Sequence, residues 1–180
     1  MKFTRSALVV TCSLVAYSAP AYAVRYMTTE EAQKILFPKA SSFEASSFNL
    51  DQDKISQLKN LSRVRISQSQ FAYWNVRRGA IREGFFFVDE VIGKHETITY
   101  AVGFSLDQKI MGIEILEYRE NYGSEIKDAE WRAQFVGKNS TNELSLGKDI
   151  KNISGATLSC LHITEGVRKL SHLMELELGK

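Results

Sequence analysis

A short segment near the end of the chain combines hydroxyl groups with a backbone that can turn sharply. Residues 149–160 read DIKNISGATLSC, and residues with helical periodicity follow them. A glycine such as Gly155 just before a helix lets the backbone approach a ligand closely, and the first amides of the helix lack intrahelical acceptors. The helix dipole is positive at this end, so the segment predicts a seat for a phosphate. On these residues alone, the alternative is an ordinary helix cap by Ser154 or Thr157.

The first 23 residues have the pattern of a secretory signal peptide. Lys2 and Arg5 precede the apolar residues 7–17, and Ala-Tyr-Ala at 21–23 matches the small-x-small cleavage pattern. The apolar run is too short to span a bilayer. The sequence therefore predicts export from the cytoplasm, with a signal peptide over 1–23 and a single domain over 24–180.

The charge of the exported part is balanced. The sequence has 23 basic and 21 acidic residues, and residues 1–23 hold two of the bases and none of the acids, which leaves 21 of each sign. This balance indicates no nucleic-acid-binding patch. Beyond residue 23 the sequence has one cysteine, Cys160, so an internal disulfide is excluded. The three histidines lack metal-ligand spacing, and no metal site is predicted.

The patterning predicts an α+β fold, an antiparallel meander flanked by N-terminal helices and packed by a C-terminal helix. Capping residues and apolar spacing indicate helices over 28–37 and 50–61, with a serine-rich loop at 41–47 between them. A further helix is expected at 127–137. The last helix, which runs to about residue 178, presents one apolar face and is expected to dock on the sheet.

The strands are predicted from runs of β-branched and aromatic residues with polar or glycine breaks between them. Apolar and polar residues alternate in the last two runs, so the sheet is expected to bury one face. The predicted strands cover 63–68, 71–78, 83–93, 96–105 and 109–120.

These segments resemble the FMN-binding domain family. The likeness rests on SGATLS at 154–159 opening a helix, with EYRENYG at 117–123 and WRAQFVGK at 131–138 upstream, and it extends from about residue 84 to 170. The family includes the periplasmic flavin-carrying subunits of the sodium-pumping NADH:quinone oxidoreductase and of the Rnf complex. This chain looks most similar to the compact single-domain members. The resemblance implies FMN as the cofactor.

The resemblance also implies which residues hold that cofactor. In the family, a periplasmic flavin transferase that uses FAD esterifies the threonine of a Ser/Thr-Gly-Ala-Thr motif to the phosphate of FMN. By this likeness Thr157 is the acceptor, and Glu120 with Gly123 resembles a Glu-Thr-Pro-Gly element that lies near the flavin. The expected cofactor-binding residues are Thr157, Ser154, Gly155, Ala156, Leu158, Ser159, Glu120, Tyr122, Gly123, Lys94 and His95.

One position departs from the family pattern and leaves alternatives open. The family motif has an acid where this chain has Lys151. Asp149 could serve instead if its loop is slack, or FMN could bind without a covalent bond, with Lys151 as the counter-charge of its phosphate. Nearby aromatic residues, among them Tyr118 and Trp131, could stack on the flavin or pack in the core. Residues 93–96 could border the flavin or form a solvated hairpin tip.

The resemblance implies an electron carrier, with no evident substrate of its own. Its redox partners are expected to be membrane-bound or periplasmic proteins. The protein itself is expected in the periplasm, either free or peripherally associated with the inner membrane. The alternative from another class is a flavin-free periplasmic interaction domain of the same fold.

Overall fold

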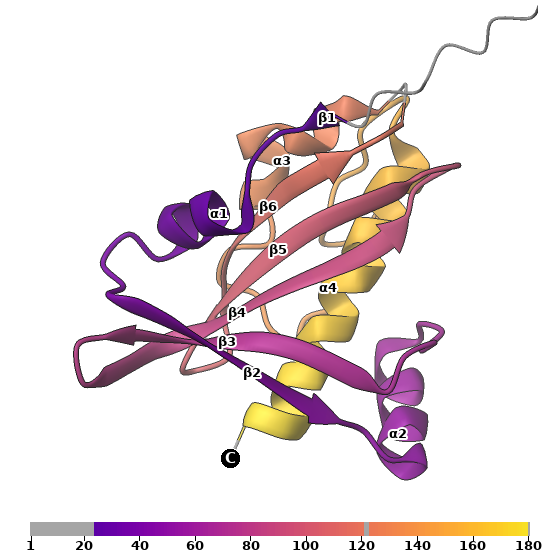
Figure 1. The fold of residues 1–180 in the computed structure, drawn as a ribbon. Coiled ribbons are helices and arrows are strands. Elements are labelled where there is room, and N and C mark those ends of the chain that lie inside the picture. Colours follow the sequence, from indigo (N-terminus) through magenta and orange to yellow (C-terminus); the bar gives the residue numbers. More distant parts are fainter. Residues whose placement is uncertain (1–23, 121–122, 180) are drawn as a thin grey trace, which may run out of the picture.

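The computed structural model describes residues 24–120 and 123–179, which form one antiparallel sheet with helices on both faces (Figure 1). The six strands lie in the order β1-β6-β5-β4-β3-β2. The strands are β1 (Val24–Arg25), β2 (Ser42–Asn49), β3 (Gln70–Arg78), β4 (Ile81–Ile92), β5 (Thr97–Ser105) and β6 (Ile110–Tyr118). The helices are α1 (Thr29–Leu36), α2 (Gln52–Ser62), the 3-10 helix η1 (Ser124–Lys127), α3 (Ala129–Ala133) and α4 (Thr157–Leu178). The predicted α+β fold, with its C-terminal helix packed on the sheet, is confirmed.

The two N-terminal helices begin where the sequence predicts. Thr28 and Glu31 form a reciprocal capping box at the start of α1. Asp51 caps α2 by accepting a hydrogen bond from the amide of Lys54 over 2.8 Å. Helix α2 ends at Arg63, whose left-handed backbone (φ 55°) stops the helix.

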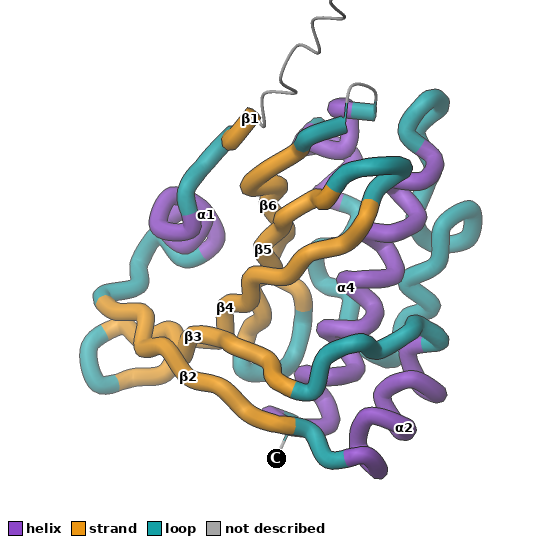
Figure 2. The backbone as a smooth tube through the Cα atoms, turned by 45° about the vertical axis from the view of Figure 1, so that its right-hand side comes forward, coloured by secondary structure: helices purple, strands orange, loops and turns teal. Residues whose placement is uncertain are grey.

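The centre of the sheet is buried on both faces, so the expectation of one buried face is wrong there. The consecutive residues Phe86 and Phe87 point to opposite sides and are both buried. Phe87 belongs to the larger core, which α4 covers, and Phe86 belongs to a smaller core that includes Leu36 and Phe37 at the end of α1. Figure 2 shows α1 and α4 on the two sides of the strands.

Three predicted elements differ from the structure. The serine-rich segment 41–47 is not a loop but most of strand β2. Phe43 and Phe48 pair with β3, and their rings pack on Phe86 of β4 and Tyr73 of β3. Residues 63–68 are not a strand, since the helix stop at Arg63 leads into an unpaired connection. The helix expected at 127–137 is the shorter η1 and α3, followed by turns.

Helix α4 packs closely on the sheet at a glycine of the helix, and a buried polar network joins the helix to the strands. A Cβ at Gly166 would lie 2.2 Å from the hydroxyl of Tyr100, so only glycine permits this approach. The Tyr100 hydroxyl donates to Asp89 over 2.6 Å, and Lys169 on α4 pairs with the same carboxylate at 2.8 Å. Burial raises the pKa of Tyr100 well above its ordinary value, and the Asp89 carboxylate raises it further, so the phenol stays protonated and acts as the donor.

Replacing Lys169 with methionine is expected to lower the free energy of unfolding by about 3 kcal/mol, because the Asp89 carboxylate stays buried without its cation. Chemical denaturation of the purified protein measures the loss. Lys34→Met on the exposed side of α1 is the matched control and should cost little. Equal stability of Lys169→Met and the unmodified protein would contradict this account of how α4 is held.

Candidate functional site

The turn before α4 has the backbone that the sequence predicts, and its helix end has no side-chain cap. Gly155 adopts φ +87°, a left-handed conformation that favours glycine. The N-cap residue is Ala156, so neither Ser154 nor Thr157 caps the helix, and the first turn carries no acidic residue. The interpretation of this segment as an ordinary side-chain cap is therefore wrong. The first amides of α4 remain available as donors at the positive end of a 22-residue helix.

A cavity of about 610 Å³ opens beside this helix end, and the described residues that line it are all among those expected to hold the cofactor. They come from the turn between β4 and β5, from the end of β6 and from the start of α4. The lining residues are Lys94, His95, Glu120, Gly155, Ala156, Thr157, Leu158 and Ser159. Three segments that are distant in the sequence thus meet at one site.

The other expected residues lie near this cavity or outside the residues that the structure describes. Ser154 is exposed in the turn itself. Gly123 lies behind the turn, where an added Cβ would come within 3.1 Å of the Ala156 Cβ. Tyr122 lies outside the described residues.

Glu120 holds the β4–β5 turn next to the start of α4. Its Oε1 accepts hydrogen bonds from the backbone amides of His95 (2.5 Å) and Glu96 (3.0 Å). Burial alone raises the pKa of Glu120, but the amides of Glu96, His95 and Lys94 outweigh it, so the pKa lies below its ordinary value. The carboxylate thus positions Lys94 and His95 on the cavity wall.

A second contact ties the same turn to α4. The Nδ1 atom of His162, in the second turn of α4, lies 3.1 Å from the carbonyl oxygen of Gly93. This histidine was not expected at the site. A single histidine on a helix gives no sequence signal for a contact with a residue 69 positions away.

Thr157 is exposed, and its hydroxyl group has a neighbour that the sequence does not reveal. The amide Nδ2 of Asn152 donates to Thr157 Oγ1 over 2.9 Å. The residue before Asn152 is fixed through its backbone, because Trp131 Nε1 donates to the Lys151 carbonyl and the Lys151 amide donates to Gln134, each over 2.8 Å. Loop contacts of this kind follow no periodicity, so spacing cannot predict them.

Asp149, considered as a substitute for the acid of the family motif, makes contacts within its own loop. Its carboxylate accepts hydrogen bonds from the amides of Ser145 (2.7 Å) and Leu144 (3.1 Å), and it pairs with Lys138 at 3.3 Å. The role considered for Asp149 needed a slack loop, and these contacts hold the loop in place. The side chain of Lys151 is exposed and does not line the cavity.

Tyr118, Trp131 and Cys160 belong to the core of the protein. Tyr118 is 2% exposed, and its hydroxyl lies 3.1 Å from Ser159 Oγ under the first turn of α4. Trp131 is 4% exposed and packs edge-on against Phe135. Cys160 is fully buried, and burial raises the pKa of its thiol, which leaves the thiolate disfavoured. The core alternative for the two aromatic residues is therefore correct.

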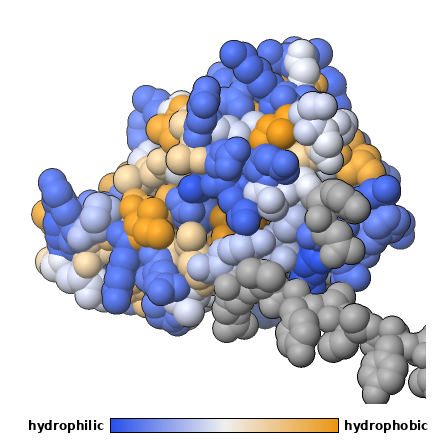
Figure 3. All heavy atoms as spheres, turned by 90° about the horizontal axis from the view of Figure 1, so that it is seen from above, coloured by the Kyte–Doolittle hydropathy of each residue, from blue (hydrophilic) through white to orange (hydrophobic). Residues whose placement is uncertain are grey.

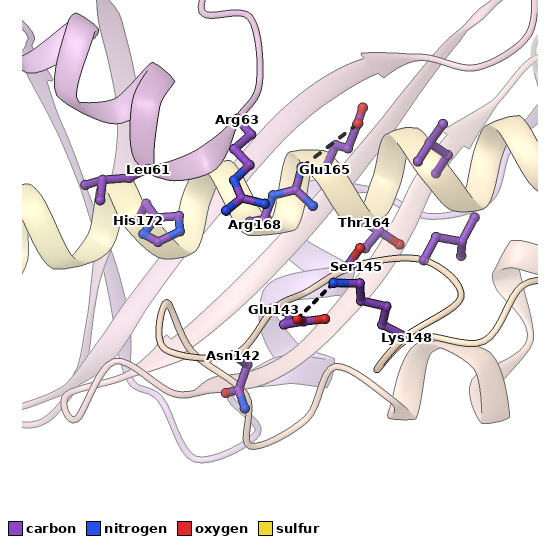
Figure 4. Close-up of a pocket in the computed structure, with 12 residues that line it drawn as sticks. Leu61, Arg63, Asn142, Glu143, Ser145, Lys148, Thr164, Glu165, Arg168 and His172 are labelled. Carbon is purple, nitrogen blue, oxygen red and sulfur yellow. Dashed lines mark hydrogen bonds and ion pairs between the residues drawn. The ribbon is translucent and has the colours of Figure 1, made fainter.

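A second cavity, of about 360 Å³, lies farther along α4, and the described residues that line it include none of the expected site residues (Figure 4). Arg168 crosses it and donates to the carbonyl oxygens of Ser62 (2.6 Å) and Leu144 (2.9 Å). Glu143 and Lys148 pair with each other at 3.0 Å on its far side. Arg168 thus ties the end of α2 and the loop at Leu144 to α4, which is a structural role.

Within residues 24–120 and 123–179, no helix is both long and apolar enough to cross a membrane. The same residues contain no group of three or more histidine, cysteine, aspartate or glutamate side chains arranged to hold a metal ion.

The family model of the FMN-binding domain matches residues 93–172. These residues belong to the FMN-binding domain family. The match begins at the turn that carries Lys94 and His95 and includes the start of α4, so it spans the described residues that line the 610 Å³ cavity. FMN is accordingly the cofactor of this domain. A search of the curated proteins found no significant match.

The residues present fit FMN at this cavity. Its phosphate would meet the uncapped amides of α4 and the cation of Lys94. The cavity wall of Leu158, His95 and the Gly155 backbone would hold the flat ring system of the FMN-binding domain.

Replacing Glu120 with alanine is expected to destabilise the FMN-binding domain by roughly 1 kcal/mol at neutral pH, because two amides of the β4–β5 turn lose a charged acceptor that is partly screened by solvent. The pKa of Glu120 is lowered in the folded state, so this stabilisation is complete above its ordinary value of 4.5 and disappears as the pH falls through the lowered pKa. Denaturation curves across this range measure the difference. Glu96→Ala, an exposed glutamate of the same turn, is the control and should show no such pH dependence.

Proposed function

We propose that this protein is an exported electron carrier that holds FMN through a phosphoester bond to Thr157. The observation that carries the proposal is the exposed hydroxyl of Thr157 at the uncapped start of α4, on the wall of a cavity within an FMN-binding domain. A covalent bond at this point places the phosphate among the free amides of the helix end. It also prevents loss of a soluble cofactor outside the cytoplasm.

The helix end favours the charge that attachment brings. A phosphodiester carries one negative charge, and a helix N-terminus stabilises such a charge by about 0.3–1 kcal/mol for each exposed interaction. Lys94 on the cavity wall adds a positive charge. No acidic side chain of the first turn of α4 opposes it.

FMN supplies the redox chemistry, and the chain's own residues bind and orient it. Glu120 fixes the turn that forms one wall, and Gly155 shapes the other. Leu158 lines the cavity and is 41% exposed, so the cavity wall includes apolar surface. Viewed from the end at which α4 begins, the surface is largely hydrophilic with separate apolar spots (Figure 3). A surface of this kind suits brief contacts with a redox protein.

The remaining parts of the proposal rest on the sequence. Residues 1–23 have the pattern of a signal peptide, which supports export to the periplasm, where a flavin transferase using FAD would act on Thr157. The electron donor and acceptor are then membrane-bound or periplasmic proteins. Lys151 in the place of the family's acid favours a second candidate, a carrier that holds FMN without the covalent bond.

Thr157→Ala is expected to abolish attachment, because the acceptor oxygen is removed. The protein is produced in the periplasm together with an active flavin transferase, and intact-mass and peptide mass spectra are recorded. The unmodified sequence should carry one FMN on the peptide that contains Thr157. Thr157→Ser should retain it, and Ser154→Ala, which removes the other exposed hydroxyl of the same turn, should also retain it.

Two results would contradict covalent attachment. One is the unmodified mass for the original sequence beside a transferase that labels a known substrate. The other is yellow colour that is lost on denaturation and filtration, which would establish the non-covalent candidate.

A further inference from the structure

We propose that Asn152 orients the hydroxyl group of Thr157 for the attachment of FMN. The inference rests on the proposed function, because it assigns a role in forming the phosphoester bond. The two side chains are in direct contact, with 2.9 Å between Asn152 Nδ2 and Thr157 Oγ1. Both residues are exposed, so the contact lies where a transferase can reach it.

Asn152 reaches Thr157 from a backbone that is fixed on both sides. Before it, the amide and carbonyl of Lys151 bind Gln134 and Trp131, each over 2.8 Å. After it, the carbonyl of Ile153 accepts a hydrogen bond from the turn at 3.1 Å. The Asn152 side chain therefore starts from a held position. A donor on a fixed backbone loses little further conformational entropy when it binds the hydroxyl, and this favours the hydrogen bond.

The direction of the hydrogen bond decides what the hydroxyl group of Thr157 can do. The amide of Asn152 donates to one lone pair of Oγ1, so the hydroxyl proton is left to donate to another acceptor. Because Thr157 is exposed, that acceptor can be a base of the transferase. The amide thus keeps the transferable proton directed away from the protein.

The attachment step is balanced as a phosphoryl transfer from FAD. Oγ1 of Thr157 attacks the phosphorus that carries the riboflavin part, and a new P–O bond forms. The pyrophosphate bond of FAD breaks, AMP leaves, and the hydroxyl proton passes to the base of the transferase. The Asn152 amide can then donate to an oxygen of the anionic product. This hydrogen bond is stronger because its acceptor is charged.

A carboxylate at position 152 would act in the opposite sense. It would accept the hydroxyl proton of Thr157 and hold it toward the protein, and its negative charge would repel the incoming phosphate. The change from asparagine to aspartate alters charge and hydrogen-bond direction with almost no change of shape. It therefore separates the orienting role of the amide from simple space filling.

The test is the rate of FMN attachment by a purified flavin transferase with FAD, followed by intact-mass spectrometry. Asn152→Ala should lower kcat for the protein substrate by about three- to tenfold, the value of one hydrogen bond, with KM little changed. Asn152→Asp should lower kcat further. Asn60→Asp, an exposed asparagine on α2 at the opposite end of the molecule from the start of α4, is the matched control and should leave both constants unchanged (Figure 1). Thermal melting confirms that each variant is folded.

Each other outcome overturns a different statement. Equal kcat for Asn152→Ala and the original sequence would overturn the role of Asn152 and leave attachment at Thr157 intact. A rise in KM with unchanged kcat would assign Asn152 to docking of the transferase and overturn the orienting role. An original sequence that takes up no FMN would overturn the proposed function and this inference together.

Discussion

The position of α4 on the sheet is the constraint on which the site depends. The helix buries one side in the larger core from Ala156 and Cys160 onward, while Thr157 and Leu158 of its first turn are exposed and no side chain caps it. Gly166 and the pair of Lys169 with Asp89 fix the helix against β4 and β5. The same two strands meet at the turn that holds Lys94 and His95. Seating the helix therefore also sets the distance between the helix end and the opposite wall of the cavity.

The walls of the cavity are held by polar contacts of the backbone. Glu120 binds the amides of the β4–β5 turn, and His162 contacts the Gly93 carbonyl from α4. On the other side, Trp131 binds the Lys151 carbonyl of the segment that leads into the motif. A covalently held cofactor needs little affinity from its protein, but it needs one orientation toward its redox partners. These contacts supply a rigid frame for that orientation.

The local sequence correctly predicts those helices and strands that are marked by capping residues or by a composition typical of strands. The capping residues Thr28 and Asp51 mark real helix starts, and the strands from Phe71 onward follow their aromatic and β-branched composition. Strand β2 was missed because serine is a frequent loop residue, whereas here the pairing with β3 and the packing of Phe48 decide the structure. Long-range pairing of this kind leaves no mark in a short window of sequence.

The sequence predicted which residues gather around the candidate site, but not the contacts that hold them there. The resemblance gathered residues from three separate segments, and the structure brings eight of them around one cavity. It did not indicate that Glu120 works by holding backbone amides, or that Asn152 contacts Thr157. Both contacts come from the tertiary arrangement of loops. Asp149, a residue that sequence alone left open as the missing acid, is occupied with its own loop.

The central claim is that the phosphate of FMN is joined to Thr157 at the start of α4. A two-dimensional ¹H–³¹P correlation spectrum of the flavin-loaded protein tests it directly, because coupling passes only through bonds. The account predicts one phosphorus signal that correlates with both the Hβ proton of Thr157 and the terminal ribityl protons of the flavin. A phosphorus signal that correlates with the ribityl protons alone would contradict it.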